Sequence, residues 1–384
     1  MTEQAKVPAI RFAGFTDPWE QRQLGELVTT TIGGGTPSTS NPAYWDGEIP
    51  WIQSSNVLED TLFDVDIPKA ITQKGLEESA AQIVPENSIA VVTHVGVGKL
   101  IYLPFQYSTS QDFISLCGLK GDARYTCYAL WKRLQEDLHI VQGSAIKGIT
   151  KEDLLEKNLP MPSVEEQAQI GVLFSQLDNL ITLHQRKYDK LVVFKKSMLE
   201  KMFPKDGESV PEIRFAGFTD PWEQRKFSDI VNVCSGKDYK HLEEGPIPVY
   251  GTGGFMTSVD EALSYDRDAV GIGRKGTIDK PYLLKAPFWT VDTLFYAIPK
   301  SDMDLEFVHC SFLNVDWKSK DESTGLPSLS KEAINETIAL VPSFNEQSRL
   351  GDFFYNLDNL ITLHQRKLEL LQNIKKSLLD KMFV

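Results

Sequence analysis

Few residues of this 384-residue chain have the types and spacing that catalysis or cofactor binding requires. The run GIGRKG (residues 271–276) matches the G-x-G-x-x-G pattern of dinucleotide-binding turns. Such a turn holds a pyrophosphate only where a helix begins directly after it. Pro281 ends any helix that would start there. The run therefore predicts a turn and no nucleotide site.

Other catalytic signatures are missing or incomplete. NPAY (residues 41–44) lacks the second proline of the Asn-Pro-Pro-aromatic signature with which adenine-methylating enzymes hold the exocyclic amine, so we interpret it as a turn. The sequence has no Walker A loop, no H-E-x-x-H, no G-x-S-x-G and only six histidines. Four widely spaced cysteines form no C-x-x-C pair, which predicts neither a metal site nor disulfides. We expect no cofactor and no catalysis by the chain itself. The cysteines are Cys117, Cys127, Cys234 and Cys310.

Glycine-rich, polar and aromatic stretches with interspersed cations have the residue types that contact DNA. Glycines permit close backbone approach, Thr and Ser donate to phosphates, and Arg, Lys, Asn and Gln read base edges. Ordinary surface turns are the alternative interpretation of each stretch alone. The candidates in the first half are Gly34, Gly35, Thr36, Ser38, Tyr44, Trp45, Thr93, His94, Lys99 and Lys147. The candidates in the second half are Tyr250, Gly251, Thr252, Gly253, Arg274, Lys275, Thr277, Trp289 and Thr293.

The net charge of −13 argues against an independent nucleic-acid binder, because phosphate contacts normally need a basic surface. Two local patches partly answer this objection. Residues 265–285 carry five cations against three anions, and residues 177–203 carry six against three. Such modest patches favour a protein that shares phosphate binding with partner subunits. No segment has the length and apolarity of a membrane span or signal peptide, so we expect a cytoplasmic protein.

Two segments occur twice in the chain. IRFAGFTDPWEQR fills residues 10–22 and again residues 213–225, and LDNLITLHQRK fills residues 177–187 and again 357–367. The chain therefore consists of two tandem units, about 7–203 and 210–384. The offset between copies falls from 203 to 180, so the interior of the second unit is 23 residues shorter. The two interiors show almost no likeness to each other.

Each unit ends in a stretch with an apolar residue at alternating steps of four and three, which predicts a long helix with a 3.5-residue seam. Neither helix can be stable alone, because its apolar seam needs a partner. The seam of the other helix is the obvious partner, which predicts an antiparallel coiled coil. Lys195 and Lys375 fall on the seam, and we expect both to extend to solvent. The predicted seam residues are Leu177, Ile181, His184, Tyr188, Leu191, Met198, Leu357, Ile361, His364, Leu368, Leu371 and Leu378.

The divergent interiors are rich in short β-type runs separated by Gly, Pro and Asn turns, with one short helix near the end of each. The runs are 48–57, 88–105, 246–256, 269–273 and 288–298, and the helices are 127–138 and 305–318. The fold class is therefore α+β: two α/β domains separated by two long antiparallel helices in a pseudo-twofold tandem repeat. The expected boundaries are 1–162 and 210–342 for the domains, 163–203 and 343–384 for the helices, and 204–209 for a linker.

This arrangement resembles the specificity subunit of type I restriction–modification enzymes over essentially the whole chain. The resemblance is carried by the duplicated segments, GGTPS (34–38) before Tyr44-Trp45, and GRKGT (273–277) with PFW (287–289) and VDT (291–293). The STGLPSL run (323–329) before the second helix and the terminal KMF of each unit complete it. The corresponding run of the first unit, GSAIKGI (143–149), matches only loosely.

The resemblance implies a division of labour. Each target-recognition domain would read one half of a bipartite, asymmetric site in double-stranded DNA, and the helices would set the unread spacer. The duplicated helices and segments would dock two identical methyltransferase subunits, and ATP-driven restriction subunits would join the full complex. Two alternatives are a self-sufficient adenine methyltransferase, which needs a cofactor pocket, and a scaffold that binds only proteins.

Overall fold

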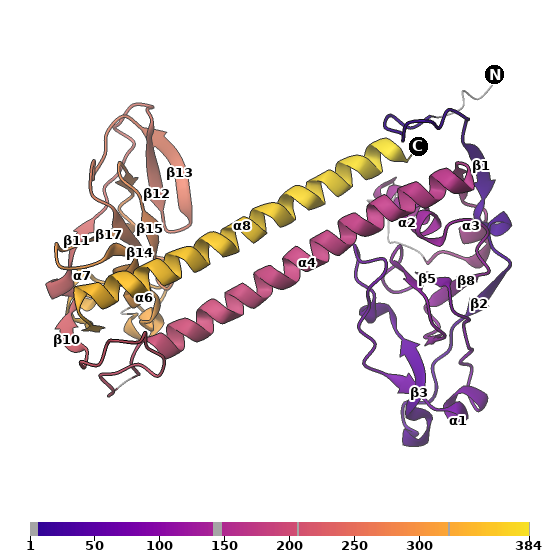
Figure 1. The fold of residues 1–384 in the computed structure, drawn as a ribbon, viewed down its shortest axis with the longest axis horizontal. Coiled ribbons are helices and arrows are strands. Elements are labelled where there is room, and N and C mark those ends of the chain that lie inside the picture. Colours follow the sequence, from indigo (N-terminus) through magenta and orange to yellow (C-terminus); the bar gives the residue numbers. More distant parts are fainter. Residues whose placement is uncertain (1–6, 141–147, 206, 322, 384) are drawn as a thin grey trace. The chain divides into compact units, whose positions relative to one another are not determined.

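The computed structural model describes residues 7–140, 148–205, 207–321 and 323–383 (Figure 1). The chain forms two compact units, the first made of residues 1–183 with 368–384 and the second of residues 184–367. Each unit therefore contains parts of both long helices, α4 (Val164–Met202) and α8 (Phe344–Met382). Among the described residues, no helix is long and apolar enough to cross a membrane.

The first unit is built on a two-stranded, a three-stranded and a four-stranded sheet. β1 (Glu20–Gln23) pairs with β9 (Asn158–Met161). The four-stranded sheet has the order β2 (Thr30–Gly33), β8 (Phe113–Cys117), β5 (Ser88–Val92) and β6 (Leu100–Leu103). The three-stranded sheet has the order β4 (Ala70–Ile71), β3 (Trp45–Ile52) and β7 (Ser108–Thr109). Its helices are α1 (Gln73–Glu77), α2 (Ala123–Ile140), α3 (Lys151–Leu155) and the 3-10 turns Leu24–Glu26, Pro42–Tyr44 and Ser54–Asn56.

The second unit repeats the same set of sheets. β10 (Glu223–Lys226) pairs with β18 (Ile338–Val341). The four-stranded sheet has the order β11 (Val231–Ser235), β17 (Leu294–Pro299), β14 (Ala269–Gly273) and β15 (Tyr282–Leu284). The three-stranded sheet has the order β13 (Gly254–Val259), β12 (Ile247–Gly251) and β16 (Trp289–Thr290). Its helices are α5 (Phe227–Ile230), α6 (Leu305–Leu313), α7 (Lys331–Glu336) and the 3-10 turn Trp317–Lys320.

The two four-stranded sheets therefore have one topology although their sequences do not match. In both sheets the strand that comes first in the chain, β2 or β11, lies at an edge and pairs with β8 or β17. That strand also pairs with the wholly buried strand, β5 or β14. All these pairs are antiparallel. A buried strand needs only apolar or small residues on both faces, so SIAVV and AVGIG fill the same position without sharing a pattern.

Within each unit α4 and α8 run antiparallel and are joined by an ion pair. In the first unit Lys375 Nζ lies 2.6 Å from an oxygen of Asp178, and in the second Lys195 Nζ lies 2.6 Å from Asp358. The expectation that these two lysines extend to solvent was wrong, because each is held at the helix contact by a carboxylate of the facing helix. Also in the second unit, His184 Nδ1 lies 2.8 Å from His364 Nδ1.

The residues of the predicted seam are the less exposed ones of the two helices. Each is buried or half-buried, whereas the outer face between them carries exposed side chains such as Leu180 and Leu183. The seam residues are Leu177, Ile181, His184, Tyr188, Leu191, Met198, Leu357, Ile361, His364, Leu368, Leu371 and Leu378.

The end of each long helix completes the core of the unit in which it lies. In the first unit Phe383 stacks on Tyr125, with ring centroids 5.3 Å apart, and contacts Phe174 on α4. In the second unit Phe203 stacks on Phe307 at 5.7 Å and contacts Phe354 on α8. The first unit therefore depends on the last residues of the chain. Figure 1 shows the end of α8 beside the start of α4 at this place.

Several expected elements differ in detail. The runs 246–256 and 288–298 are each two strands, and the helix expected at 305–318 ends at Leu313, before a separate 3-10 turn. The helix expected at 127–138 spans 18 residues, Ala123–Ile140, because its buried face begins at Tyr125. The run 88–105 is two strands, separated by a turn in which Gly96 and Gly98 have positive φ. The run 48–57 begins earlier, at Trp45, and gives way to a 3-10 turn after Ile52.

Candidate functional site

In the second unit, the candidate cations sit on a turn that the backbone holds from two sides. Strand β14 is buried throughout and ends at Gly273, and the exposed Arg274 and Lys275 follow. The Arg274 amide donates to the Thr293 carbonyl at 2.8 Å, and the Leu329 amide donates to the Arg274 carbonyl at 2.9 Å. Lys275 also forms an isolated bridge with Ser328. The turn is thus a fixed platform from which two long cationic side chains project.

Glycine is required at two places in this turn. A Cβ atom on Gly273 would lie 1.9 Å from the Thr277 carbonyl oxygen, so no side chain fits there. Gly276 has φ +90°, a conformation that other residues rarely adopt, and its amide donates to the Pro327 carbonyl at 2.8 Å. The glycines of GIGRKG serve this tight turn, as the sequence predicted, and no helix follows them.

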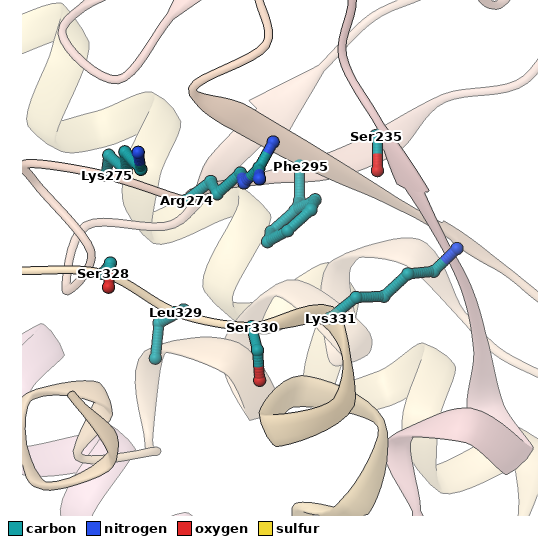
Figure 2. Close-up of a pocket in the computed structure, with 8 residues that line it drawn as sticks. All are labelled: Ser235, Arg274, Lys275, Phe295, Ser328, Leu329, Ser330 and Lys331. Atoms are coloured by element: carbon teal, nitrogen blue, oxygen red, sulfur yellow. The ribbon is translucent and has the colours of Figure 1, made fainter. Parts of the chain in front are cut away.

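Arg274 and Lys275 line an open pocket of about 370 Å³ (Figure 2). The Arg274 guanidinium carbon lies 5.8 Å from the centre of the Phe295 ring, a cation–π distance. Lys331, at the first position of α7, also lines the pocket. None of the described residues that line it is acidic. The remaining lining residues are Ser235, Ser328, Leu329 and Ser330.

The β12–β13 hairpin brings further candidates to the same turn. Thr252 and Gly253 form its tip, and the Thr252 methyl group approaches to 3.3 Å the position that a Cβ of Gly273 would take. Tyr250 lies beneath the tip, 6.3 Å from the rings of Phe255 and Tyr282. The exposed Phe255 and Met256 next to the tip escaped the sequence analysis, because single apolar residues in a β-type run carry no signal.

Two candidates of the second unit have structural roles. Trp289 is buried with Val249 and Val291, and its indole Nε1 donates to the Lys237 carbonyl at 2.9 Å. Gly251 is buried, and its carbonyl accepts from the Tyr282 hydroxyl at 2.6 Å. Thr277 and Thr293 are half-buried and shape the turn through their carbonyl groups.

In the first unit, Thr93 and His94 occupy the place that Arg274 and Lys275 occupy in the second. The Thr93 amide donates to the Asp112 carbonyl at 2.8 Å, and the Ile149 amide donates to the Thr93 carbonyl at 2.8 Å. Thr93 has no exposed surface, and its hydroxyl donates to the same Asp112 carbonyl at 3.0 Å. His94 is exposed and Lys99 is half-buried across the following turn. Lys147 lies outside the described residues.

The loop after β2 contacts this turn through residues 109–112. A Cβ on Gly34 would lie 1.8 Å from the Ser110 carbonyl oxygen, so close packing requires this glycine. The Gly35 amide donates to Thr109 at 2.8 Å, and the Thr36 hydroxyl donates to Gln111 at 2.6 Å. Further along, the Trp45 indole donates to the Ser38 carbonyl at 3.1 Å, and the Tyr44 hydroxyl donates to Glu78 at 2.9 Å.

The two units thus share one hydrogen-bonded framework and differ in the side chains that it presents. Thr93 corresponds to Arg274 because each amide donates to the segment before the last long strand and each carbonyl accepts from the segment before α3 or α7. Gly35 corresponds to Lys237, whose amide donates to Thr290 at 2.8 Å. Such backbone bonds do not depend on residue type, so the side chains are free to diverge.

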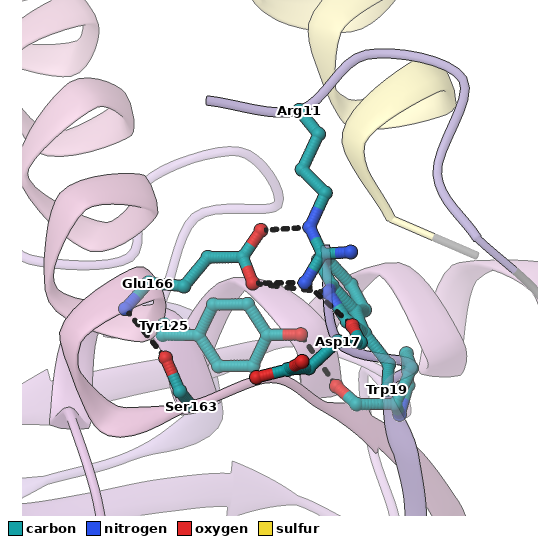
Figure 3. A network of polar contacts seen from close by, with 7 residues as sticks. Arg11, Asp17, Trp19, Tyr125, Ser163 and Glu166 are labelled. Carbon is teal, nitrogen blue, oxygen red and sulfur yellow. Dashed lines mark hydrogen bonds and ion pairs between the residues drawn. The ribbon is translucent and has the colours of Figure 1, made fainter. Parts of the chain in front are cut away.

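The duplicated segment, residues 10–22 and 213–225, is fastened to each unit by a buried ion pair (Figure 3). Arg11 donates to both oxygens of Glu166, at 2.7 and 2.8 Å, and the Trp19 indole donates to the same carboxylate at 3.2 Å. Arg214 makes the same two bonds to Glu346 in the second unit. The hydrogen bonds to the carboxylate raise the pKa of Arg11 above its ordinary value. These residues explain part of the duplication by folding alone.

Other duplicated residues have no such structural role. Within both copies of the segment, the alanine, the threonine, the glutamate and the first glutamine are exposed. These residues are Ala13, Thr16, Glu20 and Gln21, with their counterparts Ala216, Thr219, Glu223 and Gln224. Leu180 and Leu183 on α4 and Leu360 and Leu363 on α8 are between 44% and 47% exposed. Folding alone does not demand that exposed residues match between the two copies.

The topology, the paired frameworks and the divergent turns define a protein with two unlike recognition domains of one fold. The family model described as "Type I restriction modification DNA specificity domain" matches residues 16–192 and 219–373. The chain belongs to this family. The repeat of the match follows the two units.

Individual relatives agree with this assignment. The type I restriction enzyme MjaIX specificity subunit of Methanocaldococcus jannaschii is 23% identical over 404 residues, which cover 95% of this chain and 92% of that protein. The MjaVIII specificity subunit of the same organism is 24% identical with equal coverage. The crystal structure of the S subunit of a type I restriction-modification system from M. genitalium aligns with a TM-score of 0.72 at 19% identity, over 99% of both chains. That structural likeness shows the fold.

Proposed function

We propose that the chain is the DNA-specificity subunit of a type I restriction–modification complex and acts in the cytoplasm. Each target-recognition domain reads one half of a bipartite, asymmetric site in double-stranded DNA. The observation that carries the proposal is the pair of matching frameworks that present Thr93 and His94 in one domain and Arg274 and Lys275 in the other. One scaffold with two sets of side chains is what reading two different half-sites requires.

Within this proposal, the candidates fall into two groups. His94, Lys99, Thr252, Gly253, Arg274 and Lys275 project from the turns and reach the DNA, together with Ser38, Tyr44 and Trp45 at the end of the β2–β3 loop. Gly34, Gly35, Thr36, Thr93, Gly251, Thr277, Trp289 and Thr293 shape the turns that hold them. Lys147 remains a candidate on sequence grounds alone.

The expected domain boundaries remain part of the proposal: recognition domains at 1–162 and 210–342, joined through helices at 163–203 and 343–384 and a linker at 204–209. We propose further that α4 and α8 form one antiparallel coiled coil that relates the domains by a pseudo-twofold axis and fixes the spacer. Two ion pairs support this coiled coil. Lys195 of α4 binds Asp358 of α8, and at the equivalent positions Lys375 of α8 binds Asp178 of α4.

Two methyltransferase subunits would dock on the duplicated exposed surface, defined by Leu180 and Leu183 on α4 and Leu360 and Leu363 on α8. Changing Leu180 and Leu183 to Glu should leave one methyltransferase per chain, and changing all four should leave none, as measured by the mass of the assembled complex. Two methyltransferases on the four-fold variant would exclude this surface. In this arrangement the partners supply methylation and ATP-driven cleavage, and the chain is not itself an enzyme.

Methylome sequencing of cells that carry the chain with its methyltransferase tests the reading of half-sites. Replacing residues 271–277 by the corresponding turn of a relative should change one half of the methylated site and leave the other half and the spacer as they were. A change in both halves would refute independent reading. Unaltered methylation after exchange of both turns would favour the protein-only scaffold.

A second variant tests the ruler. Insertion of seven residues at matched positions of α4 and α8 keeps the seam in phase and lengthens each helix by roughly 10 Å, at 1.5 Å per residue. At 3.4 Å per base pair this predicts a spacer about three base pairs longer with both half-sites unchanged. An unaltered spacer would contradict the coiled-coil ruler. A self-sufficient methyltransferase would instead methylate DNA without any partner, which assay of the isolated chain with S-adenosylmethionine decides.

A further inference from the structure

The candidate turns are followed in both units by a lysine at one and the same structural position. Leu329 and Ile149, which bond to the two turns, are followed by a Ser or Thr that caps a short helix, and the next residue is Lys331 or Lys151. Ser330 accepts from the Ala333 amide at 2.9 Å, and Thr150 accepts from the Asp153 amide at 3.1 Å. The caps fix where each lysine leaves the backbone.

These lysines are unchanged where the side chains around them have diverged. Thr93 and His94 stand opposite Arg274 and Lys275, yet Lys151 stands opposite Lys331. Both lysines are exposed, and neither forms an ion pair with a described residue, whereas the exposed Lys226, Lys285 and Lys318 each have a carboxylate partner. In a chain of net charge −13, an unpaired cation beside other unpaired cations favours an anionic partner.

The pocket shows what Lys331 faces. It lines the same open hollow of about 370 Å³ as Arg274 and Lys275, with hydroxyl groups of Ser235, Ser328 and Ser330 among the lining residues. Figure 2 shows Lys331 on one side of the Phe295 ring, extending from the start of α7 toward the strand that carries Ser235, and Arg274 on the other side of the ring. Three cations and several hydroxyls, with no carboxylate among the described lining residues, match the donors that DNA phosphates recruit.

We propose that Lys331 and Lys151 each bind a backbone phosphate of the DNA and thereby set the depth of the neighbouring turn without reading sequence. This deepens the proposed function and rests on it. The two domains read different half-sites, so side chains that differ between them can carry sequence information. A lysine that is the same at matching positions of both domains can contact the part of DNA that is the same in every sequence. That part is the phosphate backbone.

The test uses the full chain assembled with its methyltransferase and two fluorescent duplexes, one with the methylated site and one with the same bases scrambled. Lys331→Ala should weaken binding to both duplexes by the same factor, about eightfold at 0.1 M salt, and lower the salt slope by about 0.9. The double variant Lys331→Ala with Lys151→Ala should bind both duplexes about 60-fold more weakly, and its salt slope should fall by about 1.8, twice the change of the single variant. The methylated sequence should stay the same, and Lys331→Arg should retain binding.

Lys280→Ala is the matched control, because Lys280 is exposed in the same domain and outside the pocket. A Lys331→Ala effect no larger than that of the control overturns the phosphate contact, and so does a loss confined to the methylated duplex or an altered methylated sequence. Circular dichroism melts verify that the variants are folded. If the unmodified complex itself does not prefer its own site over the scrambled duplex, the proposed function fails, whereas a normal preference with silent lysines refutes this inference alone.

Discussion

Replacing Arg11 with Met isolates the energetic role of the ion pair that fastens the duplicated segment. The Glu166 side chain has no exposed surface and accepts two bonds from Arg11 and one from Trp19. Without the guanidinium, the buried carboxylate has only the Trp19 indole as a side-chain donor. Removing one partner of a buried pair typically costs about 3–5 kcal/mol, because the remaining charge is uncompensated. We expect the first unit to lose that much stability.

The double variant Arg11→Met with Glu166→Gln separates this cost from the worth of the pair. Glutamine keeps the shape and an acceptor for Trp19 while it removes the charge, so the double variant should recover more than half of the loss. The coupling free energy of the cycle is this recovery plus the cost of Glu166→Gln alone, so it should be at least about 1.5–2.5 kcal/mol.

Hydrogen exchange is the suitable assay, because a chain with two units does not unfold in one two-state step. Amides of β1 and β9 should lose protection in Arg11→Met while those of β10 and β18 keep it, and Arg214→Met should give the reverse pattern. A loss below about 1 kcal/mol, or a double variant as unstable as the single one, would refute the account of an uncompensated carboxylate.

Three further variants test packing, pH dependence and close approach. Phe383→Ala empties a site where the residue is 4% exposed, so the first unit should lose about 3–5 kcal/mol of stability, measured by hydrogen exchange of its amides, although the change lies at the far end of the sequence. Burial and the charge of His364 lower the pKa of His184, so the helix pair should be fully stable above about pH 6.5 and less stable below it. Thermal melts of the helices at pH 7.5 and 5.5 measure this difference. The difference should be smaller in His364→Asn. Gly34→Ala would place a methyl group 1.8 Å from the Ser110 carbonyl oxygen, so it should disturb recognition of one half-site in methylome sequencing and leave the other.

The long helices were accessible from sequence because their seam repeats over many turns. The stretches expected at 163–203 and 343–384 correspond to helices at Val164–Met202 and Phe344–Met382. Periodicity reports which face is apolar and carries no information on what neutralises a cation on that face. Lys195 and Lys375 were therefore misjudged, because their partners Asp358 and Asp178 lie on the other helix, more than 160 residues away.

The common framework of the two recognition domains was not accessible from sequence. Its bonds join backbone atoms, such as the Thr93 amide with Asp112 and the Arg274 amide with Thr293, and backbone bonds leave no residue signature. For the same reason the loose likeness between the runs that end at Ile149 and Leu329 hid the matching roles of these two residues. The one sequence signal of this match is the likeness of the tripeptides that follow, Thr150-Lys151-Glu152 and Ser330-Lys331-Glu332.

The distribution of paired and unpaired cations resolves the conflict between an acidic chain and a DNA target. Within the cationic stretch 177–203, Lys195 is bound to Asp358 and Lys201 to Glu212, so part of that patch is neutralised inside the protein. Arg274, Lys275 and Lys331 have no carboxylate partner among the described residues and face one pocket. The excess negative charge elsewhere then works against non-specific binding. Net charge alone misjudges such a protein, because a sum over the chain does not show that three cations without a carboxylate partner among the described residues line one pocket.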